Sequence, residues 1–229
     1  MKAYYSMIVD LTGKRCVVIG GGIVAERKIR ALLEASAVVS VVSPTFTPPI
    51  AEWTESGLVG GQQRGYRRED IEEAFLVIAA TNLPDVNYQV YLDGVEQHKL
   101  LNIADRPELS NFIVPAALRR GKLIISVSTS GASPSAALAI RNEIEHQYGE
   151  DYEKFVDFLS DFRAEVKRVI LDRSQREHIF KEAAKLDILH MIRTGTFEPF
   201  RLRVMEQLCQ DPSHFSLPDF LFLLTRVKL

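Results

Sequence analysis

Three small residues near the start of the chain have the types and spacing of a phosphate-binding turn. Gly20, Gly22 and Ala25 fit the pattern G-x-G-x-x-A and directly follow an apolar, β-branched run. The first glycine allows a tight turn, the second lets a pyrophosphate approach the backbone, and the alanine lets a helix pack close to the sheet. The start of that helix presents unpaired N–H groups and a positive dipole end to phosphates. The pattern predicts dinucleotide binding, and the alternative is a glycine turn without a ligand.

Polar residues also follow other predicted strands, where open α/β sheets bind their ligands. Ser43 ends the second strand, at the place where an acidic residue usually bonds the adenosine ribose. Because that carboxylate is replaced by a hydroxyl, the motif leaves NAD and NADP undecided. Thr81 follows the fourth strand, beside the expected path of the cofactor.

The first candidate for acid–base chemistry is Asp105, because a carboxylate at a strand end can accept a proton when it is partly desolvated. A turn-forming aspartate explains its position equally well, since Pro107 follows closely. Asn102 is a weaker candidate and fits a backbone-bonding residue. A hydroxyl-rich loop at 128–133 could bind an anionic group, although N-capping of a helix accounts for Ser133.

Basic residues and histidines give weaker indications. Arg119, Arg120 and Lys122 form a small basic cluster that either captures a polyanionic substrate or lies in a solvated turn. The five histidines lack the spacing of metal ligands, so we expect no resident metal. The formal net charge of -2 indicates neither nucleic acid nor an anionic membrane as partner.

The remaining global features are those of a globular protein of the cytoplasm. Hydrophobic residues make up 46% of the chain, which is normal for a globular protein. The only two cysteines, Cys16 and Cys209, argue against a disulfide framework and favour a reducing compartment. The chain shows no signal-peptide pattern and no apolar run that approaches the roughly 18 residues of a membrane span.

The elements that must position these residues alternate between strands and helices in the first half of the chain. The predicted strands are 17–19, 38–42, 59–63, 75–79 and 100–103, and the predicted helices are 23–34 and 86–97. This alternation is typical of a parallel, doubly wound sheet.

The pattern changes after about residue 111. A strand is predicted at 122–128, and Ser133–Pro134 suits the start of a helix. Residues 150–194 contain no glycine or proline and repeat apolar side chains at helical spacing. Within them, Ser174–Glu177 matches a capping box that would start another helix. Short helices are expected at 198–210 and 218–228.

Together these motifs resemble the precorrin-2 dehydrogenase family, which includes the N-terminal part of the multifunctional bacterial siroheme synthase. The resemblance covers about residues 5–170 and is much more specific than the glycine turn. It is carried by Gly13–Lys28, Leu76–Thr81, Asn102–Asp105 with Phe112–Pro115, and Ser128–Pro134. The family's Ser-Ser-Gly-Gly type of loop reads Ser128-Thr129-Ser130-Gly131 here, which is a mild departure.

The resemblance implies NAD-dependent oxidation of precorrin-2 to sirohydrochlorin, and in some members insertion of ferrous iron to give siroheme. It implies an α/β chain with a Rossmann-type parallel-sheet domain at 1–113, a small α+β dimerisation segment at 114–149 and a helical C-terminal domain at 150–229. The middle segment implies a homodimer, with no nucleic-acid or membrane partner. The alternative function is a nucleotide-sensing Rossmann module that binds without turnover.

The resemblance also implies roles for particular residues. Asp105 matches the family's essential aspartate and is expected to be the general base. The expected contacts of NAD are Gly20, Gly22, Ile23, Val24, Ser43 and Thr81. The expected contacts of the substrate are Asn102, Ser128, Thr129 and Ser130.

Overall fold

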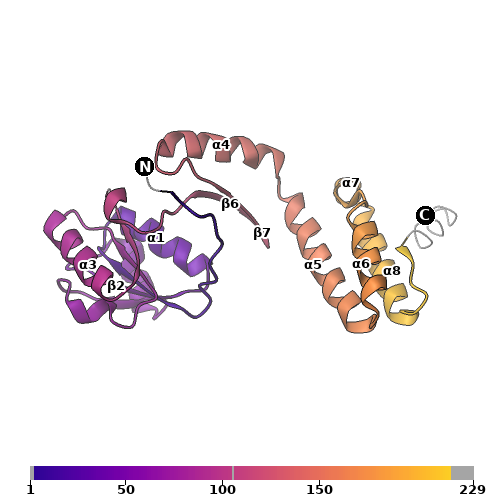
Figure 1. Cartoon of the computed structure of the whole chain (residues 1–229), viewed down its shortest axis with the longest axis horizontal. Helices are drawn as coiled ribbons and strands as arrows, with labels where there is room; N and C mark the ends of the chain where they lie inside the picture. Colours follow the sequence, from indigo (N-terminus) through magenta and orange to yellow (C-terminus); the bar gives the residue numbers. More distant parts are fainter. Residues whose placement is uncertain (1–2, 105, 218–229) are drawn as a thin grey trace. The chain divides into compact units, whose positions relative to one another are not determined.

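The computed structural model describes residues 3–104 and 106–217. The chain divides into two compact units (Figure 1). One unit comprises the residues up to 114 together with 130–132. The other comprises residues 115–129 and the residues from 133 onward.

The first unit is built on a five-stranded parallel sheet with the strand order β3-β2-β1-β4-β5. Its strands are β1 (Arg15–Ile19), β2 (Val38–Val42), β3 (Gly60–Gln62), β4 (Leu76–Ala79) and β5 (Leu100–Ile103). Ile19 at the end of β1 is in register with Val42 of β2 and Ala79 of β4. The residues that follow these strands therefore meet at one edge of the sheet. The order matches the first five strands of the classic Rossmann order 3-2-1-4-5-6, which confirms the predicted fold class.

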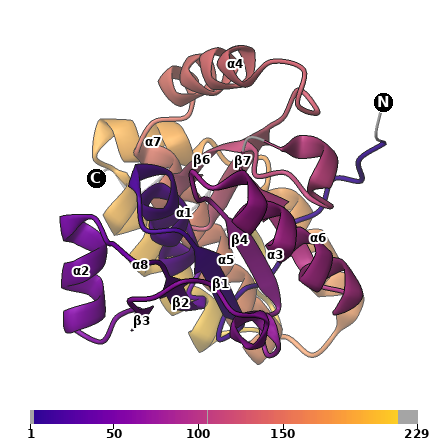
Figure 2. The same ribbon diagram turned by 90° about the vertical axis from the view of Figure 1, so that its left-hand side faces the viewer.

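Helices cover both faces of this sheet, as expected when the four strands β1, β2, β4 and β5 are mainly Val, Ile and Leu. On one face, α1 (Ile23–Glu34) and α2 (Pro48–Glu55) contribute the buried side chains of Ala25, Ile29 and Ile50. On the other face, α3 (Pro84–Glu96) contributes Val90. Figure 2 shows the strands side by side with these helices around them.

The second unit begins with an antiparallel hairpin of β6 (Ala116–Arg120) and β7 (Leu123–Val127), which packs against α4 (Pro134–Gln147) (Figure 1). Four further helices follow and lie side by side: α5 (Asp151–Val169), α6 (Arg173–Ala183), α7 (Ile188–Thr194) and α8 (Phe197–Gln210). Their core is rich in aromatic rings, with Phe158 against Phe162, Phe197 and Phe200.

Three local predictions differ from the structure. The capping box at Ser174–Glu177 is wrong, because Asp172 is the N-cap of α6 and its carboxylate accepts from the Gln175 N–H at 2.6 Å. No element is predicted between 42 and 59, where Pro48 and Pro49 begin α2, and proline suits the first turn of a helix. Arg119 and Arg120 lie in β6 and not in a turn. The helix expected at 218–228 lies outside the described residues.

Among residues 3–104 and 106–217, no helix is both long and apolar enough to cross a membrane.

Candidate active site

The turn after β1 needs glycine at two consecutive positions because of the protein's own packing. Gly20 has φ of +124°, and a Cβ atom there would overlap the carbonyl group of Ala80. A Cβ atom on Gly21 would overlap the carbonyl oxygen of Thr45. The turn is thus pressed between the segments that follow β4 and β2.

Gly22 differs from its neighbours, because a Cβ atom there would meet nothing within 4 Å. It is the N-cap of α1, and no side chain caps that helix start. Ile23 and Val24 of the first turn are exposed, whereas Ala25 is fully buried against the sheet as predicted. An open glycine at an uncapped helix N-terminus is a cradle that fits a pyrophosphate.

The loop after β2 is tied to this cradle. Ser43 is buried, and its N–H donates to the carbonyl oxygen of Gln62 at 3.1 Å. The Thr47 N–H donates to the carbonyl oxygen of Gly21 at 2.9 Å. The Thr47 hydroxyl donates to Oε2 of Glu26 in the first turn of α1, at 3.1 Å. Ser43 therefore lies beside the glycine turn, where an adenosine ribose is expected.

Thr81 opens the loop between β4 and α3. Its hydroxyl lies 2.8 Å from Oδ1 of Asn87 and accepts from the Leu83 N–H at 3.0 Å. The preceding residue is anchored to β1, since the Ala80 N–H donates to the carbonyl oxygen of Ile19 at 2.7 Å. The sequence reasoning missed Asn87, whose side-chain amide is buried beneath this loop.

A pocket of about 190 Å³ lies at the carboxyl ends of β4 and β5. Its lining residues are Thr81, Asn82, Pro84, Asn87, Tyr88, Ala104, Arg106 and Leu109. Asp105, the predicted general base, lies outside the described residues, but its two neighbours in the sequence line this pocket. The Ala104 N–H donates to the carbonyl oxygen of Ala79 at 2.7 Å, which continues the strand pairing to the pocket rim.

Side chains from the segment after the pocket cover the outer edge of β5. Oδ1 of Asn111 accepts from the Leu101 N–H at 2.7 Å, and Oγ of Ser110 accepts from the Ile103 N–H at 2.9 Å. Nδ2 of Asn102 donates to the carbonyl oxygen of Phe112 at 3.3 Å. This bond ties the amide to the main chain, and the substrate contact of Asn102 stays a prediction.

In the hydroxyl-rich loop, two residues bond each other within the second unit. The Thr129 hydroxyl lies 3.0 Å from both the N–H and the carbonyl oxygen of Ser133. Oγ of Ser133 accepts from the Ala136 N–H at 3.2 Å, so the predicted N-cap of α4 is confirmed. The backbone of Ser130, in the same loop, is left-handed, with φ of +56°. The substrate contacts of Ser128, Thr129 and Ser130 stay predictions.

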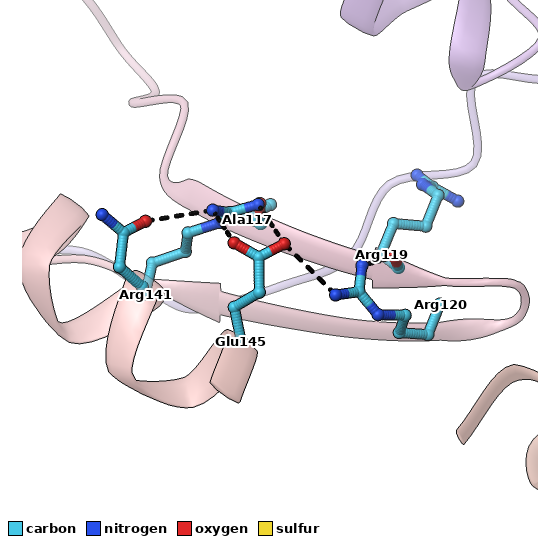
Figure 3. A network of polar contacts seen from close by, with 6 residues as sticks. Ala117, Arg119, Arg120, Arg141 and Glu145 are labelled. Atoms are coloured by element: carbon cyan, nitrogen blue, oxygen red, sulfur yellow. Dashed lines mark hydrogen bonds and ion pairs between the residues drawn. The ribbon is translucent and has the colours of Figure 1, made fainter. Parts of the chain in front are cut away.

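The basic cluster is largely paired with acidic side chains. Figure 3 shows Arg120 of β6 and Arg141 of α4 converging on the carboxylate of Glu145. Lys122 lies 3.7 Å from Asp157 and 3.5 Å from Asp161 of α5. Arg119 is exposed, as strand alternation requires for the residue between Leu118 and Arg120.

In the part of the chain that the structure describes, no group of three His, Cys, Asp or Glu side chains is placed to hold a metal ion. The open Gly22 and the uncapped N-terminus of α1 fit a phosphate-bearing organic cofactor.

Comparisons with known proteins agree with this geometry. The family model NAD_binding_7, which describes NAD(P)-binding proteins, matches residues 7–116. A siroheme synthase from Nitrosococcus oceani is 32% identical over 195 residues, which is 85% of this chain and 42% of that protein. A precorrin-2 dehydrogenase from Priestia megaterium is 31% identical over 178 residues, which is 78% of this chain and 88% of that protein.

Among solved structures, SirC, a precorrin-2 dehydrogenase, has a TM-score of 0.75 at 28% sequence identity, covering 89% of this chain and all of that one. The chain thus spans less than half of the siroheme synthase but most of the Priestia megaterium enzyme and all of SirC.

Proposed function

Because the chain belongs to the precorrin-2 dehydrogenase family, we propose that it oxidises precorrin-2 to sirohydrochlorin with NAD. The observation that carries this proposal is the placement of two features on one sheet edge. The glycine cradle follows β1, and the pocket follows the adjacent strand β4 and its neighbour β5. A cofactor held at its phosphates by the cradle can therefore extend toward the pocket.

Dehydrogenation removes one hydride and one proton from the substrate. When bound, NAD supplies the hydride acceptor. Gly20, Gly22, Ile23 and Val24 would hold its phosphates, and Ser43 would lie beside the adenosine ribose. A hydroxyl at this position bonds a ribose without excluding a 2′-phosphate as a carboxylate would. Our choice of NAD over NADP rests on the family.

The proton requires a base, and we assign this role to Asp105. The proposed substrate contacts are Asn102 and the loop residues Ser128, Thr129 and Ser130. In the first unit, the pocket residues Asn82, Tyr88 and Arg106 would face the reacting edge of the substrate. The Arg106 guanidinium is paired with Glu108 through Nε, and its remaining N–H donors suit a substrate that carries carboxylates.

Replacement of the base tests the assignment. Asp105→Ala and Asp105→Asn should slow NADH formation from precorrin-2 by roughly 10²- to 10⁴-fold, the usual contribution of a general base. The NAD dissociation constant should stay nearly unchanged, because the cradle is intact. Glu55→Gln, which removes an exposed carboxylate at the end of α2, is the control for loss of one charge. Parental turnover by Asp105→Ala would refute the role of the aspartate.

Addition of precorrin-2 alone separates an enzyme from a nucleotide sensor. An enzyme produces many equivalents of NADH, whereas a sensing module binds NAD stoichiometrically and produces none. A second arm supplies sirohydrochlorin and ferrous iron under anaerobic conditions, with iron as a substrate. A shift of the absorbance spectrum to that of siroheme would add chelatase activity to the proposed function, and an unchanged spectrum would limit the chain to dehydrogenation.

We also propose that the chain is a cytoplasmic homodimer whose contact lies in the segment 114–149, between a Rossmann domain at 1–113 and a helical domain from 150. Two-stranded ribbons are marginal alone. The helix on this ribbon, α4, carries the apolar side chains of Leu138 and Ile140, which are 54% and 44% exposed.

Light scattering should show a dimer that Leu138→Glu dissociates. Leu171→Glu, on the link between α5 and α6, should leave the dimer intact. A monomeric parent protein would overturn the assembly.

A further inference from the structure

A single buried amide fixes the loop that joins the cradle to the pocket. Asn87 lies one turn into α3 and is only 7% exposed. Its Oδ1 accepts from the Thr81 N–H at 3.3 Å and lies 2.8 Å from the Thr81 hydroxyl. Its Nδ2 donates to the Thr81 carbonyl oxygen at 3.0 Å. The amide therefore bonds both main-chain polar groups of Thr81 as well as its side chain.

These contacts determine what the Thr81 hydroxyl can do. A threonine hydroxyl has one proton to donate and two lone pairs. Two acceptors lie within hydrogen-bond distance of the Thr81 hydroxyl: Oδ1 of Asn87 at 2.8 Å and the Leu83 carbonyl oxygen at 3.1 Å. One lone pair already accepts from the Leu83 N–H. The hydroxyl is thus engaged inside its own loop and is not directed outward to a ligand.

The loop so fixed touches both halves of the candidate site. Ala80 packs its carbonyl group against the position where a Cβ of Gly20 would stand, so a shift of this loop would move the glycine turn. Thr81, Asn82 and Pro84 form one wall of the pocket. A displacement of the loop at Thr81 would therefore change the cradle and the pocket together.

We propose that Asn87 is a positioning residue for cofactor binding: its amide holds Thr81, and the loop conformation fixed in this way, not a bond from the Thr81 hydroxyl to the cofactor, sets the shape of the cradle and the pocket. The inference rests on the proposed function for the identity of the ligand.

A double-mutant cycle on the NAD dissociation constant tests it. Asn87→Ala and Thr81→Val should each weaken NAD binding about tenfold, and the double variant should be no weaker than either single one. Groups that act as one unit show such non-additive effects. Thr81→Ser, which keeps the hydroxyl, should bind NAD like the parent protein. The KM for NAD should rise in parallel, with a smaller change in kcat.

A double variant that is weaker than either single variant would contradict the proposal. If Asn87 and Thr81 affect NAD binding independently, the factors multiply and the double variant binds about a hundredfold more weakly, which would overturn the proposal. Gln89→Ala is the matched control, since it removes an amide that bonds Asp93 on the same helix, away from the pocket. Its NAD affinity should be unchanged.

The test also covers a variant that does not fold and a protein that lacks the proposed activity. If Asn87→Ala does not fold, the cycle is repeated with Asn87→Asp, which keeps the acceptor for the Thr81 N–H and replaces the donor to the Thr81 carbonyl with a charged oxygen. The binding readout needs no turnover. A parent protein that binds NAD but leaves precorrin-2 unchanged would therefore refute the proposed function while the cycle still decides the role of Asn87.

Discussion

At the scale of single residues, the three consecutive glycines of the cradle answer to different requirements. Gly20 and Gly21 leave no room for a side chain, because carbonyl groups of the chain itself lie against them. Gly22 has open space and an ordinary backbone, with φ of −89° and ψ of −175°. Packing thus requires the first two glycines but not the third, whose open space suits the approach of a ligand.

This difference predicts opposite effects of the same substitution. Gly22→Ala should keep the parental melting temperature and weaken NAD binding by tenfold or more, because its methyl group occupies the approach of the pyrophosphate. Gly21→Ala should lower the melting temperature, because its methyl group meets the Thr45 carbonyl oxygen. Gly65→Ala is the control, an exposed glycine that also has open space around it. Undiminished NAD affinity in Gly22→Ala would place the phosphates elsewhere.

The sequence pattern predicted the glycine motif of this site but did not predict Gly21 and Asn87, for a physical reason. Gly20, Gly22 and Ala25 belong to a local motif whose spacing reflects one turn, so the sequence alone is enough to predict them. Gly21 is required by its contact with Thr45, which follows β2 and comes close only when separate strands become neighbours. Asn87 lies only six residues after Thr81, but its bonds depend on how the loop folds back onto α3, which no local spacing indicates.

At the scale of elements, buried strands and long helices followed from the sequence, and short elements did not. β2 and α1 have the predicted bounds, since a run of valines interrupted only by Ser40 and a three-turn periodicity are both clear over their length. β6 was missed because Arg119 and Arg120 end it, and charged side chains at a hairpin read as a turn. Arg120 is tolerated in the strand because Glu145 neutralises it from α4.

The packing of α5 on α8 includes an ionised group whose protonation should weaken the helical unit. The Arg168 guanidinium, with a further hydrogen bond from the Cys209 thiol at 2.9 Å, lowers the pKa of Glu165 from about 4.5 to about 2. A folded-state pKa below the unfolded value stabilises the folded state above pH 4.5, and this stabilisation is lost as the pH falls toward 2.

The expected result is a melting temperature of the helical unit that drops between pH 4.5 and pH 2, with a smaller drop in Glu165→Gln. The effect is modest, since Arg168 is largely exposed to water. Circular dichroism over this range measures it. Glu206→Gln, on α8, serves as the control because its carboxylate bonds only an exposed amide in the same helix among the contacts described. Identical pH profiles for the parent and Glu165→Gln would exclude this carboxyl as a source of acid sensitivity.

At the scale of the whole molecule, the two cysteines report separately on the two units. Cys16 lies in β1, is fully buried, and has a pKa raised by burial to about 11. Cys209 lies in α8 and is exposed, although its hydrogen bond to Glu165 also raises its pKa. A thiol reagent should therefore label Cys209 in the native protein and reach Cys16 only when the Rossmann unit opens.

Ligand binding should then protect one thiol and not the other. Because the cradle lies wholly in the first unit, NAD at about 100 times its dissociation constant should stabilise that unit by about 2.7 kcal/mol. Labelling of Cys16 in moderate urea should slow by up to a hundredfold, while labelling of Cys209 keeps its rate. Mass spectrometry of the labelled peptides measures both, and Cys209→Ser isolates the buried thiol. Protection of Cys209 as well would mean that its thiol is not freely accessible in the native second unit, and protection of neither would mean that the first unit does not bind NAD.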